Sequence, residues 1–410
     1  MESSPDNRRI RLAIILAAEW RGGMLRNALL LARLYASRAW EGIGTVEVVV
    51  ALPRSGPYDW QALRRWCREV GGISIRPFAW RPMAADAARV ILPEALVPPG
   101  AAPVLLPDDG GRELRDADAW LFFASHGHAR IPWLRPTAVF CADLLPRRVA
   151  AAHGGPHGFG DRSTLAEAMI GWRRARCAFA TTPTTHSDLV SYAGVHPDRA
   201  VLAPLQTEAA MPETEIVLPP AGSEPGILWV TNRQAHKNHL AAVAALRGYV
   251  SRGGGLDITV CGVSSRALDP ATGSDHPGAR ALADAPEVLA RMHFVGEPPD
   301  PTYRRLVASK GVLWHNVLAD NGTFAAFDAA MAGAHLVSSD YPPMRHICDR
   351  HGVAALFHPA RDPDAAATAL LEAERRLRAG IAPGHDLRPT SEADLVAAYG
   401  DILGRLMAHG

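Results

Sequence analysis

The chain has 410 residues, of which 48% are hydrophobic and 21% are charged. That balance is typical of a soluble globular protein, and the length exceeds what one ordinary hydrophobic core supports, so we expect two domains. The 43 basic and 42 acidic residues leave a formal charge of +1, so no field of the whole chain favours nucleic acid or an anionic membrane. The five cysteines are odd in number and form no Cys-x-x-Cys pair, which indicates reduced thiols in a cytoplasmic protein.

An apolar segment near the beginning of the sequence follows basic residues. Its uninterrupted run, Leu12 to Ala18, is shorter than the apolar core of a typical secretory signal and has no convincing cleavage site. We therefore interpret it as a first β-strand. No stretch approaches the roughly 18 apolar residues of a membrane span. Cytoplasmic localisation is expected, and peripheral contact with the inner face of a membrane stays open.

Short apolar runs alternate with helical patterns along most of the sequence, which is typical of β-α units around a parallel sheet. Residues 1–208 form the first predicted domain, residues 209–226 a linker rich in proline and acids, and residues 227–388 a second domain. Residues 389–410 predict a closing helix that packs back on the first domain. The candidate strands are residues 10–17, 46–52, 120–124, 138–141, 178–181, 201–205, 227–230, 256–261, 293–295, 312–315, 335–338 and 355–357. The fold class is thus α/β, with two Rossmann-like doubly wound domains facing across a cleft.

A polar loop follows the predicted strand that ends at Val230. In the sequence VTNRQAHKNH this loop carries Arg233 and Lys237, with His236 and His239 beside them, at the start of a predicted helix. Cations are unexpected there because a lysine in a first helical turn opposes the helix dipole. An arginine fork, a lysine charge and helix-start amides together suit a phosphate or diphosphate. A solvated basic loop explains the same residues, and composition leaves both interpretations open.

Two aspartates, Asp320 and Asp328, stand in ADNGTFAAFDAAM, with a predicted helix through the second. Asn321 and Thr323 are candidate caps of that helix. If Asp320 lies at the mouth of the helix and Asp328 within it, a rise of about 1.5 Å per residue puts their backbones roughly 12 Å apart. The pair then suits the two ends of a long ligand better than one small reacting group. The plain alternatives are a surface acid at Asp328 and an acid favoured by the helix dipole at Asp320.

A Gly22-Gly23 pair separates the first strand from an amphipathic helix. Glycines at this point let a ligand approach the amides of a helix start. The pair is not the Gly-x-Gly-x-x-Gly fingerprint, which argues against a nicotinamide or flavin enzyme. A tight turn without a ligand is the alternative.

Other motifs point to competing chemistries. His126-x-His128 follows a predicted strand in the manner of a metal-ligand pair, so a metal-dependent hydrolase is the runner-up function. The chance of such a pair among 17 histidines and the absence of a His-Glu-x-x-His element weigh against it. Asp116-x-Asp118 precedes its strand, which favours a strand-start pair over metal ligands. No Gly-x-Ser-x-Gly elbow is present, which disfavours a serine hydrolase.

These stretches together resemble the retaining GT-B glycosyltransferases of family 4 over most of the chain. In VTNRQAHKNH, Lys237 stands at that family's diphosphate-binding lysine and Arg233 at its arginine partner. ADNGTFAAFDAAMAGAHL resembles the family motif in which two glutamates flank seven residues, with aspartate at both positions here. The resemblance implies that Asp328 binds ribose hydroxyls and that Asp320 meets the transferred sugar. The further donor-binding residues that it implies are Asn321, Gly322, Thr323 and Phe324 at the sugar and phosphates, and Gly296 and Glu297 near the base.

The first half of the chain matches the family less fully. Gly22-Gly23 stands at the family's Gly-Gly loop. In AVFCADLLPRR, Asp143 keeps the acid of a His-Asp pair whose histidine position holds Ala142. His126 and His128 are then candidates for the family's cleft histidine, beside Asp143 on the acceptor side.

The resemblance implies an enzyme that moves a hexose, mannose-like or glucose-like, from a GDP-sugar or UDP-sugar to a hydroxyl of a glycan, lipid or small molecule, as in polysaccharide biosynthesis. It implies a retaining reaction without a metal or other cofactor. Asp320, Lys237 and Arg233 would be the catalytic residues, the two cations stabilising charge on the leaving diphosphate. No nucleic-acid partner is expected. A non-catalytic GT-B partner subunit is the second alternative, because both glutamates are replaced.

Overall fold

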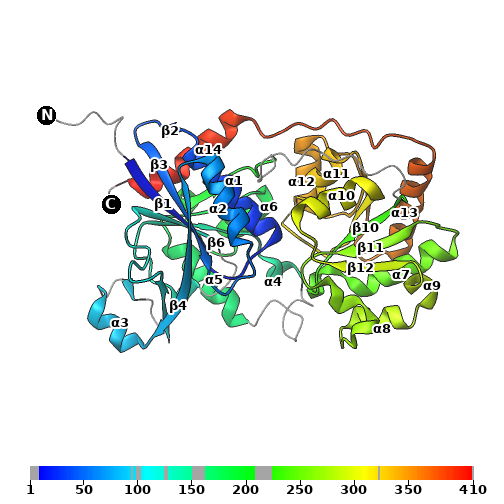
Figure 1. The fold of residues 1–410 in the computed structure, drawn as a ribbon, viewed down its shortest axis with the longest axis horizontal. Helices are drawn as coiled ribbons and strands as arrows, with labels where there is room; N and C mark the ends of the chain where they lie inside the picture. Colours follow the sequence, from blue (N-terminus) through cyan, green and yellow to red (C-terminus); the bar gives the residue numbers. More distant parts are fainter. Residues whose placement is uncertain are drawn as a thin grey trace. The chain divides into compact units, whose positions relative to one another are not determined.

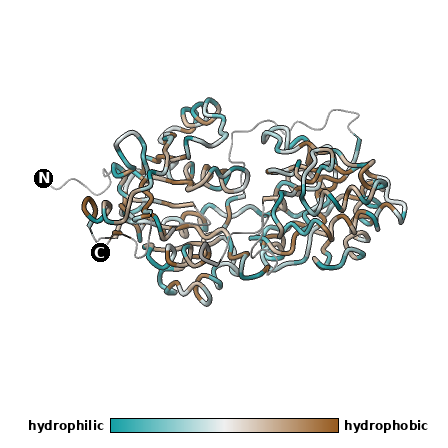
Figure 2. Tube along the Cα trace, turned by 90° about the horizontal axis from the view of Figure 1, so that it is seen from below, coloured by the Kyte–Doolittle hydropathy of each residue, from teal (hydrophilic) through white to brown (hydrophobic). Residues whose placement is uncertain are grey.

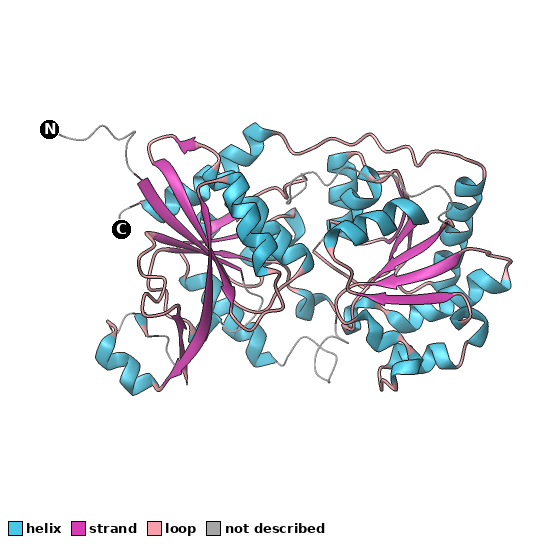
Figure 3. Ribbon diagram, in the orientation of Figure 1, coloured by secondary structure: helices cyan, strands magenta, loops and turns pink. Residues whose placement is uncertain are grey.

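The computed structural model describes residues 9–93, 96–97, 103–123, 128–149, 162–207, 224–321 and 324–408. The chain divides into two compact units. Unit 1 comprises Met1–Leu144, Asp161–Pro212 and Thr390–Gly410, and unit 2 comprises Leu145–Gly160 and Glu213–Pro389. Each unit is a sheet covered by helices (Figures 1 and 3).

Unit 1 is built on a nine-stranded sheet in the order β5-β4-β3-β1-β6-β7-β8-β9, with the short β2 beside β3. Its strands are β1 (Arg9–Leu16), β2 (Ala39–Trp40), β3 (Gly44–Pro53), β4 (Ile73–Met83), β5 (Val104–Asp108), β6 (Ala119–Phe123), β7 (Thr137–Phe140), β8 (Cys177–Ala180) and β9 (Ala200–Leu202). The strands run parallel except β5 and β2, which are antiparallel to their neighbours. Strands β6, β7 and β8 are buried at every position, as a parallel sheet covered on both faces requires.

The last helix of the chain completes the core of unit 1. The helices of this unit are α1 (Gly22–Ala36), α2 (Trp60–Val70), α3 (Ala85–Ile91), α5 (Arg162–Arg174), α6 (Pro183–Ser191) and α14 (Glu392–Met407), with 3-10 turns η3 (His128–Arg130) and η5 (Pro197–Arg199). Tyr399 of α14 packs edge-on against Tyr35 of α1 and Phe179 of β8. The Tyr35 hydroxyl donates to the Tyr399 carbonyl at 3.1 Å, which fixes α14 on this core. Figure 2 shows hydrophobic chain segments in the interior of each unit.

Unit 2 is built on a wholly parallel six-stranded sheet in the order β12-β11-β10-β13-β14-β15. Its strands are β10 (Gly226–Val230), β11 (Asp257–Cys261), β12 (Met292–Gly296), β13 (Gly311–His315), β14 (His335–Ser339) and β15 (Ala355–His358). Its helices are α4 (Leu145–Arg148), α7 (His239–Ser251), α8 (Pro277–Ala283), α9 (Pro286–Leu289), α10 (Asp300–Lys310), α11 (Ala325–Met331), α12 (Pro342–His351) and α13 (Pro363–Arg378), with turns η6 (Ala235–Lys237), η7 (Ser265–Leu268) and η8 (Pro270–Thr272). The rings of Trp229 and Trp314 contact each other at a tilt, with centroids 5.2 Å apart, and join the two central strands in the core.

The order of strands reverses at β10 in unit 2. Strands β11 and β12 follow on one side of β10, and β13 to β15 follow on the other. Open α/β sheets bind ligands at such a reversal, beyond the carboxyl ends of the strands. The loops after β10 and β13 therefore lie where a ligand site is expected. Unit 1 has the same arrangement at β1, between β3 and β6.

The predicted class, two Rossmann-like α/β domains, is confirmed, and each predicted strand is present with ends shifted by a few residues. Strands β2, β4 and β5 were not predicted. β4 (ISIRPFAWRPM) contains two prolines and two arginines with few buried positions, and β5 contains Pro107. Prolines are tolerated there because β5 is the edge strand and each half of β4 is paired on one side only, residues 73–78 with β3 and residues 79–83 with β5.

Among the described helices, none combines the length and the apolar character that crossing a membrane demands.

Candidate functional site

The loop after β10 takes its shape from its own side chains. The backbone N–H of Gln234 donates to Asn232 Oδ1 at 2.9 Å, and His239 Nε2 lies 2.8 Å from the Asn232 carbonyl oxygen. Asn238 adopts the left-handed conformation, with φ of 56°, and so separates η6 from α7. These contacts present Lys237 at the end of a fixed turn.

Lys237 contacts Asp320, which lies in the loop after β13. The lysine Nζ donates to Asp320 Oδ2 at 2.6 Å, and the backbone N–H of Asn321 donates to Oδ1 at 2.8 Å. Lys237 is 8% exposed, and the Asp320 side chain is 15% exposed. The Nε2 atoms of His315 and His236 face the same oxygen from 3.7 and 3.9 Å, beyond hydrogen-bond range. The carboxylate thus lies among one amine and two imidazoles.

Hydrogen bonds tie the loops of this edge of the sheet together. The Leu318 N–H donates to the His236 carbonyl at 2.7 Å, and the Asn316 side-chain amide donates to the Asn238 carbonyl at 3.3 Å. The side-chain amide of Asn238 donates in turn to the Ala360 carbonyl after β15, at 2.5 Å. Because three loops are joined in this way, Lys237 and Asp320 are held close to each other in the ligand-free protein.

The electrostatics of the site keep the carboxylate charged and the imidazoles neutral. Burial alone raises the pKa of Asp320, but the charge of Lys237 and the nearby His315 and His236 outweigh it, so this pKa lies well below the usual range. Burial lowers the pKa of His236 and of His315, and the charge of Lys237 acts in the same direction. A permanent anion and cation therefore meet here at neutral pH.

Asp328 lies in the first turn of α11 and is 9% exposed. The hydroxyl of Tyr303, on α10, donates to Asp328 Oδ2 at 3.1 Å. A carboxylate accepts several hydrogen bonds at once, so Asp328 can bind ligand hydroxyls beside this phenol.

Gly296 ends β12 at the same carboxyl edge of the sheet. Its φ of 76° favours glycine, and its carbonyl accepts from the Gly262 N–H at 2.7 Å and the Ser265 hydroxyl at 3.3 Å. A Cβ at Gly262 would lie 2.0 Å from the Thr231 carbonyl oxygen, so the ends of β10, β11 and β12 approach closely. The half-buried Glu297 follows directly.

Unit 1 holds the remaining described candidates. Gly22 and Gly23 are exposed and open α1, whose N-cap, Arg21, makes no side-chain cap hydrogen bond. Gly22 has a φ of 54°, a conformation that favours glycine at this turn. Asp143 is half-buried after β7, and its carbonyl accepts from Cys141 Sγ at 3.6 Å. All three candidates follow strands, at the carboxyl edge of their sheet.

Four candidates fall outside the described side chains. Gly322, Thr323 and His126 lie outside the described residues, and the description of His128, the first residue of η3, does not extend to its side chain. Their predicted roles stay predictions.

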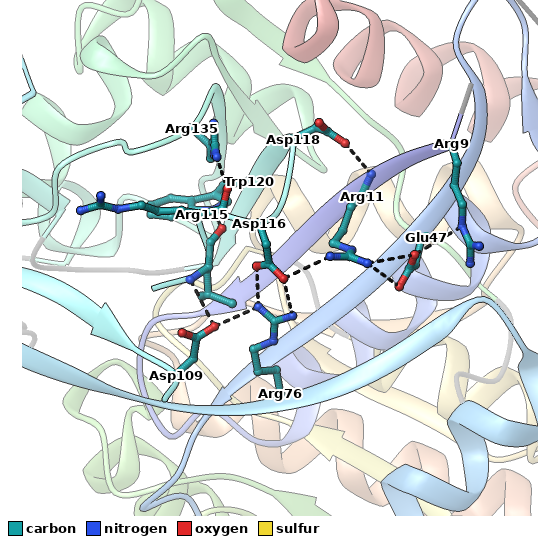
Figure 4. A network of polar contacts seen from close by, with 11 residues as sticks. Arg9, Arg11, Glu47, Arg76, Asp109, Arg115, Asp116, Asp118, Trp120 and Arg135 are labelled. Carbon is teal, nitrogen blue, oxygen red and sulfur yellow. Dashed lines mark hydrogen bonds and ion pairs between the residues drawn. The ribbon is translucent and has the colours of Figure 1, made fainter. Parts of the chain in front are cut away.

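The Asp116-x-Asp118 pair belongs to an ion-pair network before β6 (Figure 4). Both Asp116 oxygens accept from Arg76, at 2.7 and 2.9 Å, and Oδ2 also accepts from Arg11 at 3.1 Å. Asp118 Oδ2 accepts from the Arg11 N–H at 2.8 Å. The hydrogen bonds between Arg76 and Asp116 lower the pKa of the acid and raise that of the arginine. The prediction of a strand-start pair is confirmed, because arginines engage both acids.

The structure offers no support for the metal-dependent hydrolase. In the described part of the chain, no group of three or more His, Cys, Asp or Glu side chains could hold a metal ion. A cavity of about 190 Å³ lies in unit 1, away from every predicted site residue. Its lining residues are Arg33, Leu34, Ser37, Arg38, Gln206, Thr390, Glu392 and Leu395.

The sequence predicts a helix that begins near Lys237 or Asn238, and the structure places its N-cap at Asn238. The left-handed conformation of Asn238 separates η6 from α7. Helix α7 therefore begins at His239, and Lys237 lies in the preceding η6. Its charge therefore does not stand in the first turn of the helix. His236 in η6 and His239 at the start of α7 are both buried and do not present exposed charge to an anion, whereas Arg233 is exposed.

The predicted geometry of the two aspartates is wrong in one respect. Helix α11 begins at Ala325 and its N-cap is Phe324, whose own side chain makes no cap hydrogen bond, so neither Asn321 nor Thr323 is the N-cap residue. Asp320 precedes the helix, because its carboxylate binds the next backbone amide and Lys237. Helical rise therefore does not measure the separation of the two acids.

Sequence analysis did not identify the neighbours of the two aspartates. His315 ends the otherwise apolar strand GVLWH, and a polar residue at that end was the available signal. Nothing in the sequence connects Tyr303 with Asp328, because the contact joins two helices, α10 and α11.

No protein-family model matches this sequence, and no curated protein matches it. Solved structures match along nearly the whole chain. Sucrose-phosphate synthase from Thermosynechococcus elongatus is 14% identical with a TM-score of 0.64, over 97% of this chain and 98% of that chain. Anabaena HepE, solved with UDP-glucose, is 12% identical with a TM-score of 0.60, over 97% and 95%. WaaG, a glycosyltransferase involved in lipopolysaccharide biosynthesis, is 16% identical with a TM-score of 0.61, over 97% and 100%. These similarities and the two Rossmann-like units show the predicted GT-B fold.

Proposed function

We propose that this chain is a glycosyltransferase that moves a hexose from a nucleotide diphosphate sugar to an acceptor hydroxyl. The observation that carries the proposal is the contact of Lys237 with Asp320 where the strand order reverses, at the carboxyl ends of β10 and β13. A cation for the diphosphate and a carboxylate for sugar hydroxyls then stand side by side. HepE, which shares the fold and was solved with UDP-glucose, supports a nucleotide-sugar donor.

The identity of the amine at position 237 supports a phosphate-binding role. The sequence contains only two lysines, Lys237 and Lys310, among its 43 basic residues. A compact ammonium acts as a movable point charge, whereas a guanidinium imposes a planar fork. A lysine kept in an arginine-rich chain, within the sheet-edge site, fits a task that arginine performs less well. Arg233, exposed on the same loop, would contribute the second cation.

The remaining proposed donor contacts come from the family resemblance. Asp328 would accept from ribose hydroxyls, with Gly296 and Glu297 toward the base. The amides expected at the transferred sugar and phosphates are those of Asn321, Gly322, Thr323 and Phe324. In unit 1, the acceptor-side and glycine-loop candidates are Gly22, Gly23, His126, His128 and Asp143.

The proposed transfer retains configuration and uses neither a metal nor a side-chain nucleophile. Lys237 and Arg233 stabilise the charge that develops on the leaving diphosphate, and the leaving phosphate accepts the proton of the acceptor hydroxyl. The donor is a UDP-sugar or GDP-sugar carrying a glucose-like or mannose-like hexose. The acceptor is a glycan, a lipid or a small molecule, and the likeness to WaaG supports a role in polysaccharide synthesis.

A thermal-shift screen of UDP and GDP tests the donor proposal. A ligand that binds only the folded state raises the unfolding midpoint, and we expect one of the two nucleotides to do so. Lys237→Ala should abolish the rise, because it removes the buried cation. Lys310→Ala is the matched control, since that amine contacts the Glu224 carbonyl at 3.4 Å outside the site, and should keep the rise.

Two results decide between an enzyme and a non-catalytic subunit. Midpoints unchanged by both nucleotides would overturn the donor proposal. A nucleotide-dependent rise without release of nucleotide from any UDP-hexose or GDP-hexose, across glycan, lipid and small-molecule acceptors, would instead favour the non-catalytic subunit.

A further inference from the structure

The carboxylate of Asp320 occupies the place that a bound diphosphate would need. Its Oδ2 accepts a hydrogen bond of 2.6 Å from the amine of Lys237, a buried residue. A second anion at the amine would lie beside the carboxylate, where like charges repel strongly because little water screens them. The ligand-free contact and donor binding therefore compete for one cation.

His315 is a second neighbour of the same carboxylate oxygen. It ends β13 and is 1% exposed. Within the described residues, neither of its ring nitrogens has a hydrogen-bond partner, although buried polar atoms normally have one. Its Nε2 lies 3.7 Å from Asp320 Oδ2, so a shift of roughly 0.8 Å would give an ordinary hydrogen bond of about 2.9 Å.

The other oxygen of Asp320 provides a pivot for such a shift. Oδ1 accepts from the backbone N–H of Asn321 at 2.8 Å, and this bond does not involve Lys237. A small rotation of the carboxylate can therefore carry Oδ2 from the amine toward His315 while Oδ1 keeps its partner.

We propose that Asp320 closes the diphosphate site of the free protein, and that donor binding transfers its carboxylate oxygen from Lys237 to His315. His315 is then a positioning residue, because it holds Asp320 against the transferred sugar once the amine has moved to the diphosphate. The inference rests on the proposed function, and it adds an order of events: the site opens by exchanging one anion for another.

The exchange couples donor binding to a proton. In the free protein, burial and the charge of Lys237 lower the pKa of His315. The titratable groups that face the ring are Lys237 and His236 on η6, Asp320 after β13 and Tyr341 before α12. When the diphosphate neutralises Lys237, His315 is left beside an anion and its affinity for a proton rises. Nucleotide binding should therefore be accompanied by proton uptake.

Calorimetric titration of the full chain with UDP and with GDP tests the exchange. We expect Asp320→Asn to bind the nucleotide roughly tenfold more tightly, because the competing anion is gone, while turnover falls. A carboxylate that only orients Lys237 for the phosphate predicts weaker binding in this variant. His315→Leu should bind roughly tenfold more weakly, and His315→Gln, which keeps a donor, should bind nearly as the native chain does.

The combined variant and the proton count complete the test. His315→Leu should have no effect on nucleotide affinity when added to Asp320→Asn, because this variant has no carboxylate at position 320 with which His315 could form its hydrogen bond. Titrations in buffers of different ionisation enthalpy should show proton uptake by the native chain and less by His315→Gln. His335→Gln, a substitution of another buried histidine at the amino end of β14, is the control and should change neither quantity.

The outcomes separate this inference from the proposed function. If the native chain binds UDP or GDP and Asp320→Asn binds it no more tightly, the exchange is overturned and the donor proposal stands. An equal effect of His315→Leu with and without Asp320→Asn also overturns the exchange. If neither nucleotide binds any variant, the donor proposal itself fails and the exchange fails with it.

Discussion

The length of the side chain at position 320 determines which contacts its carboxylate makes. Asp320 reaches the amine of Lys237 and the amide of Asn321 at the same time, at 2.6 and 2.8 Å. A glutamate is longer by one carbon–carbon bond, about 1.5 Å, and would carry its carboxylate beyond this position. The aspartate that distinguishes the chain from the family it resembles thus has a specific geometric role in the ligand-free site.

The second aspartate gives a prediction about the nucleotide alone. If Asp328 binds ribose hydroxyls, Asp328→Asn should weaken UDP or GDP binding by about 2 kcal/mol, since charged hydrogen bonds are lost. Tyr303→Phe removes the phenol that donates to Asp328 Oδ2 at 3.1 Å and should cost about 1 kcal/mol. Calorimetric titration with the nucleotide measures both.

Inorganic pyrophosphate provides the control for the ribose prediction, because it contains the diphosphate and lacks the sugar. Its affinity should be the same in the native chain and in Asp328→Asn. An equal loss for pyrophosphate and nucleotide would contradict a ribose contact.

Secondary-structure elements were predictable to the extent that apolar runs mark buried strands. Strands such as β6 and β13 are apolar enough to be recognised in the sequence, whereas β4 contains arginines and prolines, has few buried positions and is not. The resemblance named Lys237 and Asp320, but no spacing rule shows that residues from two loops touch. That contact depends on the neighbouring positions of β10 and β13 in the sheet, and on the left-handed Asn238.

A buried glutamate joins helices α13 and α7 and gives a prediction for the stability of unit 2. Glu374 is 7% exposed and accepts from the Tyr249 hydroxyl. The Gly255 N–H lies between its two carboxylate oxygens, at 3.1 Å from Oε2 and 3.2 Å from Oε1. Glu374→Ala should lower the free energy of unfolding by about 3 kcal/mol, because it leaves these buried donors unsatisfied. Urea denaturation measures the loss. Glu372→Gln, on the exposed side of the same helix, should have little effect.

The pKa of Glu374 gives the same interaction a pH dependence. Burial raises this pKa, but hydrogen bonds from Tyr249 and Arg378 outweigh burial and lower it below the value of 4.5 in an unfolded chain. A lowered pKa means that the contribution is fully present above pH 4.5 and is lost as pH falls through the folded value. Native and Glu374→Ala proteins should therefore differ less in stability at low pH than at pH 7.

At the scale of the whole molecule, histidines with lowered pKa values should make unit 2 less stable than unit 1 in acid. Among the histidines whose side chains the structure describes, six buried or half-buried ones have pKa values lowered below 6.5, and in each case burial is the main cause. They are His236, His315, His335, His346, His351 and His358, and all lie in unit 2. Below pH 6.5 these histidines bind protons in the unfolded chain but stay neutral in the folded protein. Their contribution to the stability of unit 2 is therefore fully present above pH 6.5 and is lost as pH falls.

Hydrogen exchange at pH 7.5 and at pH 5.5 measures this inequality, after correction for the intrinsic pH dependence of exchange. Peptides from β13, β14 and α12 should lose protection at pH 5.5 before peptides from β1 and β6 do. Equal losses in the two units, or an earlier loss in unit 1, would contradict a dominant effect of these histidines.

The position of α14 has a consequence for how the chain folds during synthesis. Unit 1 takes Tyr399 of α14 into its core against Tyr35, yet unit 2 is encoded between most of unit 1 and that helix. A ribosome must therefore complete unit 2 before unit 1 receives its last helix. Until then, the apolar surface of unit 1 that α14 covers is exposed. The nascent chain at this stage is an intermediate to which a chaperone could bind.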